Sequence, residues 1–105
     1  MINFLDIPQH VALNEIFTDI FTKDNIRVEK IISHGQTTPT DKPYIQNHDE
    51  WVLVLSGESR LKLGDAEHIL KAGEYLFIPK NIEHWVTYTT NPTIWLAVHI
   101  CEQFK

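Results

Sequence analysis

From Asn25 to Cys101 the sequence is a series of short runs rich in Val, Ile, Tyr, Trp and Thr, each closed by Gly, Asn, Asp or Pro. Such runs, separated by turn residues at short intervals, are typical of the strands of an antiparallel sandwich or barrel. The breaks fall at Ser56-Gly57, Gly64-Asp65, Ala72-Gly73, Lys80-Asn81 and Asn91-Pro92. The predicted strands cover residues 26–33, 51–56, 59–63, 68–71, 75–79, 84–88 and 93–101. We therefore predict an all-β barrel over about residues 25–101.

The segment before the barrel has a different pattern. Its apolar residues recur at the spacing of one helical stripe: Leu13, Ile16, Phe17, Ile20 and Phe21. Asp19 and Lys23 stand four residues apart, as in a helical ion pair. The pattern predicts a short helix over about residues 11–23 that covers one end or edge of a sheet. A helix that binds a partner protein is the other interpretation.

Length and charge limit the domain count and the classes of partner. A chain of 105 residues that is 43% hydrophobic makes one domain, residues 1–105, with one core. Its formal net charge is −5 and it has no run of Lys or Arg, which argues against nucleic acid and anionic membrane surfaces as partners. Cys101 has no second cysteine to pair with, and no apolar run is long enough to cross a bilayer. These features predict a cytoplasmic protein whose partner is a small molecule or another protein.

Two of the predicted strands are apolar on both faces. They are the runs Trp51–Leu55 and Ile94–Val98. A strand without a polar face must be covered on both sides, and the barrel interior supplies only one cover. The second cover is the helix, another sheet or another subunit. We therefore predict a homodimer, with Trp51 or Trp95 at the interface, beside the equally simple alternative of burial within one chain.

Two spaced motifs lie within the strand region. In HDEWVLVLSG, six residues separate Glu50 from Gly57, and in GEYLFIPKNIEH, Gly73 and Pro79 precede His84. Together these motifs resemble those of the cupin superfamily, specifically the small single-domain conserved-barrel proteins, over about residues 34–99. Asn81 stands where the second motif of that family has Gly, and Asn is among the few other residues that tolerate positive φ. The resemblance implies a double-stranded β-helix, or jelly-roll, barrel.

The resemblance also implies a metal site, from which this chain departs. Cupins with a metal hold Fe, Mn, Zn or Ni with inward His, His, Glu and His side chains. Glu50 and His84 match that set, but Tyr44 and Gln46 stand where the two histidines of the first motif belong. Gln46 has an amide oxygen to offer, which is a weaker ligand than imidazole. His48 lies two residues before Glu50 and shares its face in an extended chain, so we predict it as a further ligand; exposure to water in a loop is the alternative.

Other residues are candidates for contacting a ligand in the barrel. Tyr44, Tyr88 and His99 are the predicted ligand-binding residues, and His99 is also a reserve metal ligand, a general acid or base, or a buried core histidine. The remaining candidates for the pocket wall, several of which simply fill the core, are Val52, Tyr75, Phe77 and Val86.

Two functions of different classes follow from these residues. The first is a metal-dependent enzyme that acts on a small metabolite by dioxygenation, isomerisation or decarboxylation. The second is a metal-free or non-catalytic cupin that binds a small polar ligand, such as a sugar or a carboxylic acid, through hydrogen bonds. A barrel that only assembles with a partner protein is a third. The fold alone does not choose among them.

Overall fold

The computed structural model describes residues 1–9 and 14–102, and within them the only regular elements are strands. The eight strands are β1 (Ile16–Lys23), β2 (Ile26–Ser33), β3 (Asp49–Ser56), β4 (Glu58–Leu63), β5 (Ala66–Lys71), β6 (Tyr75–Ile78), β7 (His84–Thr89) and β8 (Thr93–Ile100). The prediction of an all-β chain is confirmed. The described residues contain no helix long and apolar enough to span a membrane.

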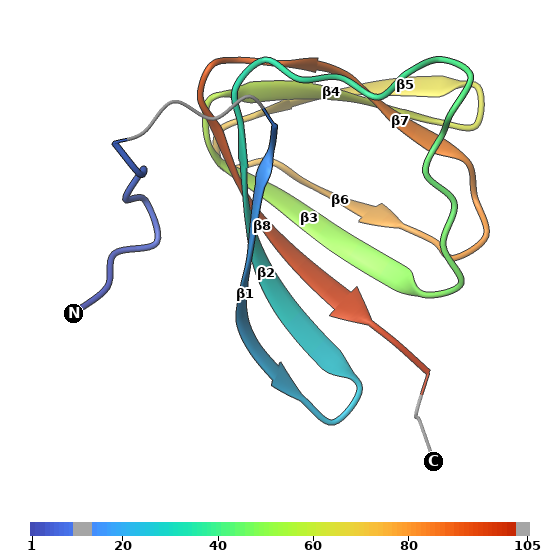
Figure 1. Cartoon of the computed structure of the whole chain (residues 1–105). Coiled ribbons are helices and arrows are strands. Elements are labelled where there is room, and N and C mark those ends of the chain that lie inside the picture. The colour runs from blue at the N-terminus through green and yellow to red at the C-terminus, as the bar shows by residue number, and fades with distance from the viewer. Residues whose placement is uncertain (10–13, 103–105) are drawn as a thin grey trace.

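The strands form two antiparallel sheets that face each other, as Figure 1 shows. One sheet has five strands in the order β1-β2-β8-β3-β6, and the other has three in the order β5-β4-β7. The core lies between them and consists of Val52, Val54, Leu61, Leu70, Ile78, Trp95 and Ala97. Because side chains alternate along a strand, the inward Trp95 and Ala97 place Leu96 and Val98 on the outer face of the five-stranded sheet.

The predicted N-terminal helix is wrong. Leu13 lies outside the described residues, but residues 16–23 form β1, which pairs with β2 at the edge of the larger sheet. The register shifts between Asp19 and Phe21, so a bulge interrupts the alternation that would have identified a strand. Ile, Phe and Thr favour strands, and the open edge of β2 supplies hydrogen-bond partners. Asp19 pairs with Arg27 across the hairpin at 3.1 Å and not with Lys23 along a helix.

The seven other predicted strands are all present, with ends that differ by at most two residues. Two of the predicted turns also have the expected backbone. Asn81 has φ of 63°, which is the left-handed conformation that allows Asn to replace Gly. Gly57 has φ of 87°, and a Cβ there would stand 2.7 Å from the carbonyl oxygen of Pro92. Gly57 is therefore required both by conformation and by space, and it sets the tight turn from β3 to β4.

Candidate functional site

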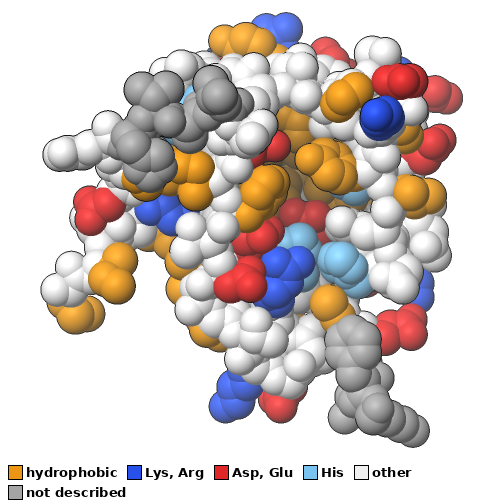
Figure 2. All heavy atoms as spheres, in the orientation of Figure 1, with side chains coloured by type: hydrophobic (Ala, Val, Ile, Leu, Met, Phe, Trp, Pro, Cys, Tyr) orange, Lys and Arg blue, Asp and Glu red, His pale blue; other side chains and the backbone are white. Residues whose placement is uncertain are grey.

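A cavity of about 130 Å³ opens between the two sheets. Figure 2 shows the hollow, with acidic and histidine side chains at one side of it and hydrophobic side chains around it. The residues that line the cavity are Glu15, Phe17, Glu29, Ile31, Tyr44, Gln46, Glu50, Val52, Leu61, Ile78, His84, Val86, Trp95 and His99. Half of them are hydrophobic and none is Lys or Arg. The cavity is thus an apolar space with acidic and neutral polar groups in its wall.

The polar groups reach the cavity because of strand pairing. His99 on β8 pairs with Glu50 on β3, and His99 also pairs with Arg27 on β2, two residues from Glu29. Residues two apart on a strand share a face, so these side chains point inward together. The neighbouring inward position on β8 is Ala97, whose small side chain leaves room above the sheet. The central strands β2, β8 and β3 therefore bring two carboxylates and an imidazole to one place.

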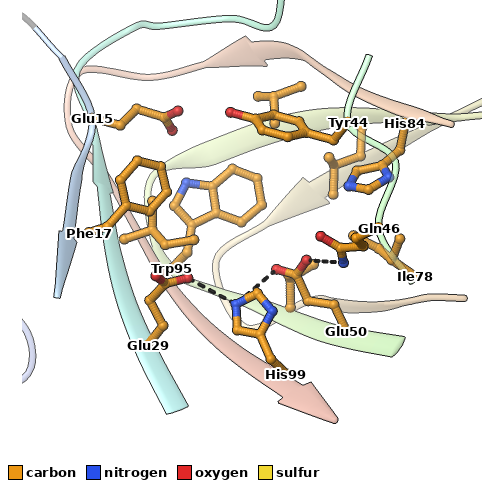
Figure 3. A pocket seen from close by; sticks show the side chains of 14 residues that line it. Glu15, Phe17, Glu29, Tyr44, Gln46, Glu50, Ile78, His84, Trp95 and His99 are labelled. Carbon is orange, nitrogen blue, oxygen red and sulfur yellow. Dashed lines mark hydrogen bonds and ion pairs between the residues drawn. The ribbon is translucent and has the colours of Figure 1, made fainter. Parts of the chain in front are cut away.

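Glu29, Glu50 and His99 form a buried polar cluster, seen in Figure 3. Each is less than 10% exposed. His99 Nε2 lies 2.9 Å from Glu29 Oε1 and 3.9 Å from Glu50 Oε2. An ionised carboxylate only accepts, so His99 donates its Nε2 hydrogen to Glu29. The amide nitrogen of Gln46 donates to the other oxygen of Glu50, Oε1, at 2.8 Å. Among the described residues, the buried Glu50 carboxylate therefore has a close hydrogen-bond donor only at Oε1.

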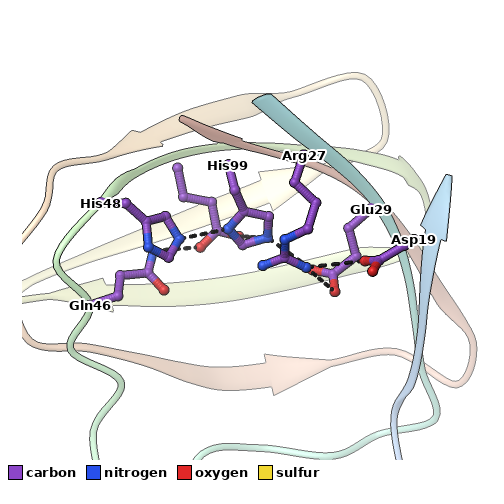
Figure 4. A network of polar contacts seen from close by, with 7 residues as sticks. Asp19, Arg27, Glu29, Gln46, His48 and His99 are labelled. Atoms are coloured by element: carbon purple, nitrogen blue, oxygen red, sulfur yellow. Dashed lines mark hydrogen bonds and ion pairs between the residues drawn. The ribbon is translucent and has the colours of Figure 1, made fainter. Parts of the chain in front are cut away.

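The cluster continues outward through a chain of contacts, shown in Figure 4. His48 Nε2 lies 2.9 Å from His99 Nδ1, and the two rings meet edge to face. On the other side, Arg27 donates to Glu29 Oε2 and to Asp19, both at 3.1 Å. Since His99 uses both ring nitrogens, it is held in one orientation. The charge of Glu29 is offset by Arg27, whereas Glu50 has no cation within ion-pair distance among the described residues other than His99.

His84 and Tyr44 form the opposite wall. The two residues pair as an isolated β-bridge, with reciprocal backbone hydrogen bonds of 2.9 Å, and their rings stack at 5.7 Å between centroids. His84 Nδ1 lies 3.1 Å from the carbonyl oxygen of Ile82, which can only accept, so Nδ1 carries a hydrogen. In the neutral ring the lone pair is then on Nε2. His84 is buried, whereas Tyr44 stands at the rim with 46% of its surface exposed.

A second polar group, formed by Glu15, Ser33 and Trp95, lies away from the carboxylate pair. Trp95 Nε1 donates to Ser33 Oγ at 3.1 Å, and Ser33 Oγ donates to Glu15 Oε2 at 2.5 Å. Burial raises the pKa of Glu15 above its usual 4.5, and the Ser33 hydrogen bond opposes that rise only in part. These contacts orient the indole ring of Trp95 along the apolar wall of the cavity.

Two further groups near the cavity have shifted pKa values. Burial raises the pKa of Tyr44, and the negative charges of Glu15 and Glu50 raise it further, so its hydroxyl keeps its hydrogen at neutral pH. Burial lowers the pKa of His48, and the neighbouring His99 lowers it as well. His48 is therefore neutral at pH 7, and a single hydrogen joins it to His99.

The structure brings five predicted site residues together at the cavity: Tyr44, Gln46, Glu50, His84 and His99. His48 contacts His99 from outside and does not line the cavity. Tyr88 lies on the outer side of β7, 40% exposed, with Arg60 over its ring.

Four more residues were predicted as candidates for the pocket wall. Val52 and Val86 line the cavity, whereas Tyr75 and Phe77 point outward. Sequence reasoning missed Glu15, Glu29 and Trp95. The sequence did offer a signal for Glu29, since it is a charged residue among the Val and Ile residues of β2. Whether its side chain points into the barrel depends on how β2 pairs with β8, which the sequence does not give.

These donors do not complete a cupin metal site. Glu50 and the Nε2 lone pair of His84 suit a divalent ion, and the Nδ1 hydrogen bond of His84 is the kind that orients a ligating imidazole. Within residues 1–9 and 14–102, however, no group of three or more His, Cys, Asp or Glu side chains is arranged to hold a metal. His48 is turned to His99, and the Nε2 of His99 is occupied by Glu29. The arrangement suits hydrogen bonding to an organic molecule better than metal ligation.

Comparison with known proteins agrees with this geometry. The Cupin domain family model matches residues 26–99, which is more than half of the chain. No curated protein matches the chain. A crystal structure from Ralstonia eutropha JMP134, whose description proposes a mannose-6-phosphate isomerase, is 32% identical, with a TM-score of 0.88 over 96% of this chain and 97% of that one.

Two more distant structures share the fold alone. KdgF from Halomonas sp. is 14% identical, with a TM-score of 0.77 over 97% of this chain and 94% of that one. The EutQ protein of Clostridium difficile is 17% identical, with a TM-score of 0.71 over 86% and 70%. The paired sheets, the two motifs ending at Gly57 and His84, and the family match together make this chain a small single-domain member of the cupin family.

Proposed function

We propose that this cupin binds a small neutral molecule rich in hydroxyl groups inside the barrel, and that binding needs no metal. One observation carries the proposal: Glu50 is buried at the cavity and, among the residues that the structure describes, accepts a hydrogen bond from Gln46 alone. A carboxylate has room for several more donors. Hydroxyl groups supply them, and the carbon framework of the same molecule would contact Trp95 and Val52.

The charge of the cavity wall favours some polar ligands over others. Glu15, Glu29 and Glu50 line the cavity, and no Lys or Arg does. A carboxylic acid or a phosphate placed among these carboxylates would meet like charge in a poorly hydrated space. Of the two ligand classes predicted from sequence, a sugar or polyol is thus favoured over a carboxylic acid. The sugar phosphate in the description of the Ralstonia eutropha protein agrees with a sugar, provided that the phosphate stays outside the cavity.

Size gives a second limit. The cavity volume of about 130 Å³ is well above the roughly 10–15 Å³ that is needed to admit a single water molecule. We therefore expect a small ligand, of about the size of a monosaccharide. Tyr44 at the rim keeps its hydroxyl hydrogen and would donate to, or stack on, the bound ring.

The test is a thermal-shift screen followed by calorimetry with neutral monosaccharides and polyols, the corresponding phosphates, small carboxylic acids and divalent metals. A neutral sugar or polyol should raise the melting temperature, and Glu50→Gln should weaken its binding about tenfold or more because charged acceptors bind more strongly. Asp65→Asn, at an exposed turn position, is the matched control and should bind normally. Stabilisation by acids or phosphates, with sugars inactive, would reject the proposal.

A metal-dependent enzyme is the second candidate, and the hydrogen-bonded His84 beside Glu50 favours it. A bound divalent ion would polarise an oxygen of a small metabolite, with Glu50, His84 and Gln46 as its protein ligands. Metal analysis of tag-free protein after repletion with Fe, Mn, Zn or Ni tests it, with Glu50→Ala and His84→Ala as controls. If the wild type binds metal stoichiometrically and both variants lose it, the metal-dependent enzyme becomes the preferred function.

The assembly and location of the protein also belong to this proposal. We propose that it is a cytoplasmic homodimer. The unpaired Cys101 agrees with a reducing compartment, and the apolar outer face of the larger sheet agrees with a dimer.

A further inference from the structure

The cavity wall holds more negative charge than the described side chains around it offset. Glu15, Glu29 and Glu50 all line the cavity. Glu29 is neutralised, because Arg27 donates to its Oε2 and His99 donates to its Oε1. Glu50 has only His99 near it, at 3.9 Å, and Glu15 has no Lys, Arg or His within ion-pair distance in the described part of the chain. Because unbalanced buried charge is costly, a ligand of opposite charge would stabilise this wall.

Glu15 immediately precedes β1 and is held in place at the cavity wall. Its Oε2 accepts a hydrogen bond from Ser33 Oγ at 2.5 Å, and the completely buried Ser33 accepts one from Trp95 Nε1 at 3.1 Å. Among the described residues, none donates to the other oxygen of Glu15, Oε1. Burial raises the pKa of Glu15, as expected for a carboxylate that has lost water without gaining a nearby cation. Glu15 therefore offers one fixed acceptor oxygen to a molecule in the cavity.

Aromatic rings surround this carboxylate. Phe17, Tyr44 and Trp95 line the cavity together with Glu15. In Figure 3, Glu15 and Tyr44 reach toward each other at one end of the cavity, Glu50 lies at the other end, and the Trp95 indole lies between them. Trp95 is 3% exposed, so the prediction of Trp95 at a subunit interface is wrong. Since the faces of aromatic rings attract cations, this end of the cavity is favourable for a positive charge.

We propose that the end of the cavity at Glu15 is an ammonium subsite, so that the barrel prefers a sugar or polyol that carries a primary amine over the same compound without one. The amine lies against Oε1 of Glu15 and the neighbouring aromatic rings, and hydroxyl groups of the same molecule donate to Glu50. The ammonium subsite rests on the proposed function, since the hydroxyl groups occupy Glu50 in both. It adds the identity of one further substituent of the ligand and the place where that substituent binds.

An ammonium group suits Glu15 better than a hydroxyl group does. Both groups donate a hydrogen bond to a carboxylate, but only the ammonium group also supplies a positive charge. The attraction between opposite charges is much stronger in a partly buried site than in water. An aliphatic amine is protonated at neutral pH, as the side chain of lysine is. The negative charge that disfavours carboxylic acids and phosphates in the cavity therefore favours an amine.

The test is calorimetry of the full chain at pH 7 with two matched pairs of compounds, in a buffer free of primary amines. The pairs are glucose with 2-amino-2-deoxyglucose and sorbitol with 1-amino-1-deoxysorbitol. Each amino compound should bind at least about tenfold more tightly than its neutral partner. Glu15→Gln keeps an acceptor for Ser33 but removes the charge, and should reduce this preference to about threefold or less. Glu102→Gln, whose side chain is 80% exposed outside the cavity, makes the same chemical change and should keep the full preference.

Two results would overturn the ammonium subsite and leave the proposed function standing. The first is that the neutral compounds bind as tightly as their amino partners. The second is a preference for the amine that Glu15→Gln leaves unchanged. Binding of the amino compounds alone supports the subsite and rejects a neutral ligand. If no member of either pair binds, the subsite is rejected, whereas the proposed function is decided by its own broader screen of neutral ligands.

Discussion

The two faces of the five-stranded sheet are built from the same strands but have opposite chemistry. The inner face carries Glu29, Glu50 and His99, all buried, whereas the outer face of β3, β6 and β8 is mostly apolar and carries Asp49 at the start of β3. On the inner face each polar group must find a specific partner, since an unpaired buried charge is costly. On the outer face apolar contact is non-directional and suits a broad surface. We therefore expect changes on the inner face to affect folding and ligand binding, and changes on the outer face to affect association.

The largest difference is expected between two tryptophans. Trp95→Ala removes a 3% exposed indole and its hydrogen bond to Ser33, and should lower the free energy of unfolding by about 3–5 kcal/mol. Trp51→Ala, on the outer face of the five-stranded sheet, should cost about 1–2 kcal/mol when dilute monomers are compared. Urea unfolding at low protein concentration measures both. Equal losses would mean that the two faces are equally buried within one chain.

The second prediction concerns the imidazole between the two carboxylates. His99→Leu leaves Glu29 and Glu50 buried without their shared partner and should cost about 3 kcal/mol. The matched control is His68→Leu on β5, half-buried in the other sheet, which should change stability by no more than about 1 kcal/mol. Urea unfolding at pH 7 measures both variants. A His99→Leu protein as stable as the wild type would show that the cluster is not held by His99.

His48 is expected to make stability depend on pH. Its folded pKa lies below the usual 6.5, so the unfolded chain binds more protons as the solution is acidified. The contribution of His48 to the free energy of unfolding is therefore complete above about pH 6.5. It is lost as the pH falls through the lower pKa that His48 has in the folded protein. His48→Gln should flatten this part of the curve of unfolding free energy against pH, and Asn47→Gln, at the adjacent position, should leave it unchanged. An unaltered slope in His48→Gln would contradict the assignment.

The smallest effect is expected at Glu15. The pKa of Glu15 in the folded protein is raised above 4.5, so the folded state binds this proton more tightly than the unfolded chain does. The stability that this proton contributes is present below about pH 4.5 and is lost as the pH rises through the pKa of the folded state. Glu15→Gln keeps an acceptor for Ser33 without the charge, and should stabilise the protein by about 0.5–1 kcal/mol at pH 7.

This gain should disappear near about pH 4, where the wild-type carboxyl is protonated. Melting temperatures at the two pH values, with Asp65→Asn as the control, measure the effect. A Glu15→Gln variant less stable than the wild type at pH 7 would show that the charge of Glu15 has a stabilising partner.

The strands were predictable because their signals are local. Alternating and continuous apolar runs between turn residues located all strands from β2 to β8, and Asn81 identified a turn that needs positive φ. β1 was missed because the bulge near Ile20 disrupts the two-residue alternation and leaves a spacing that resembles a helix. A single irregularity in pairing is enough to hide a strand, since the bulge depends on the partner strand and not on the segment alone.

The candidate site was predictable only in part. Glu50 and His84 belong to spaced motifs, and Tyr44 and Gln46 follow from counting back along the chain. Glu29 contacts a histidine seventy residues away, through strands that become neighbours only when β2 pairs with β8. No local pattern carries that information. His48 lies two residues from Glu50, yet its partner is His99, because β3 begins only at Asp49 and alternation does not extend through the loop before it.

The sequence by itself determined the strand segments, the turns at Gly57 and Asn81, the acidic balance of the chain and the absence of two of the usual metal-binding histidines. These properties depend on neighbouring residues and on residue identity. The tertiary structure decided which side chains meet in the cavity, that His99 joins Glu29 to His48, and which tryptophan faces outward. Those outcomes depend on sheet order and register, which are set by packing between segments far apart in the chain.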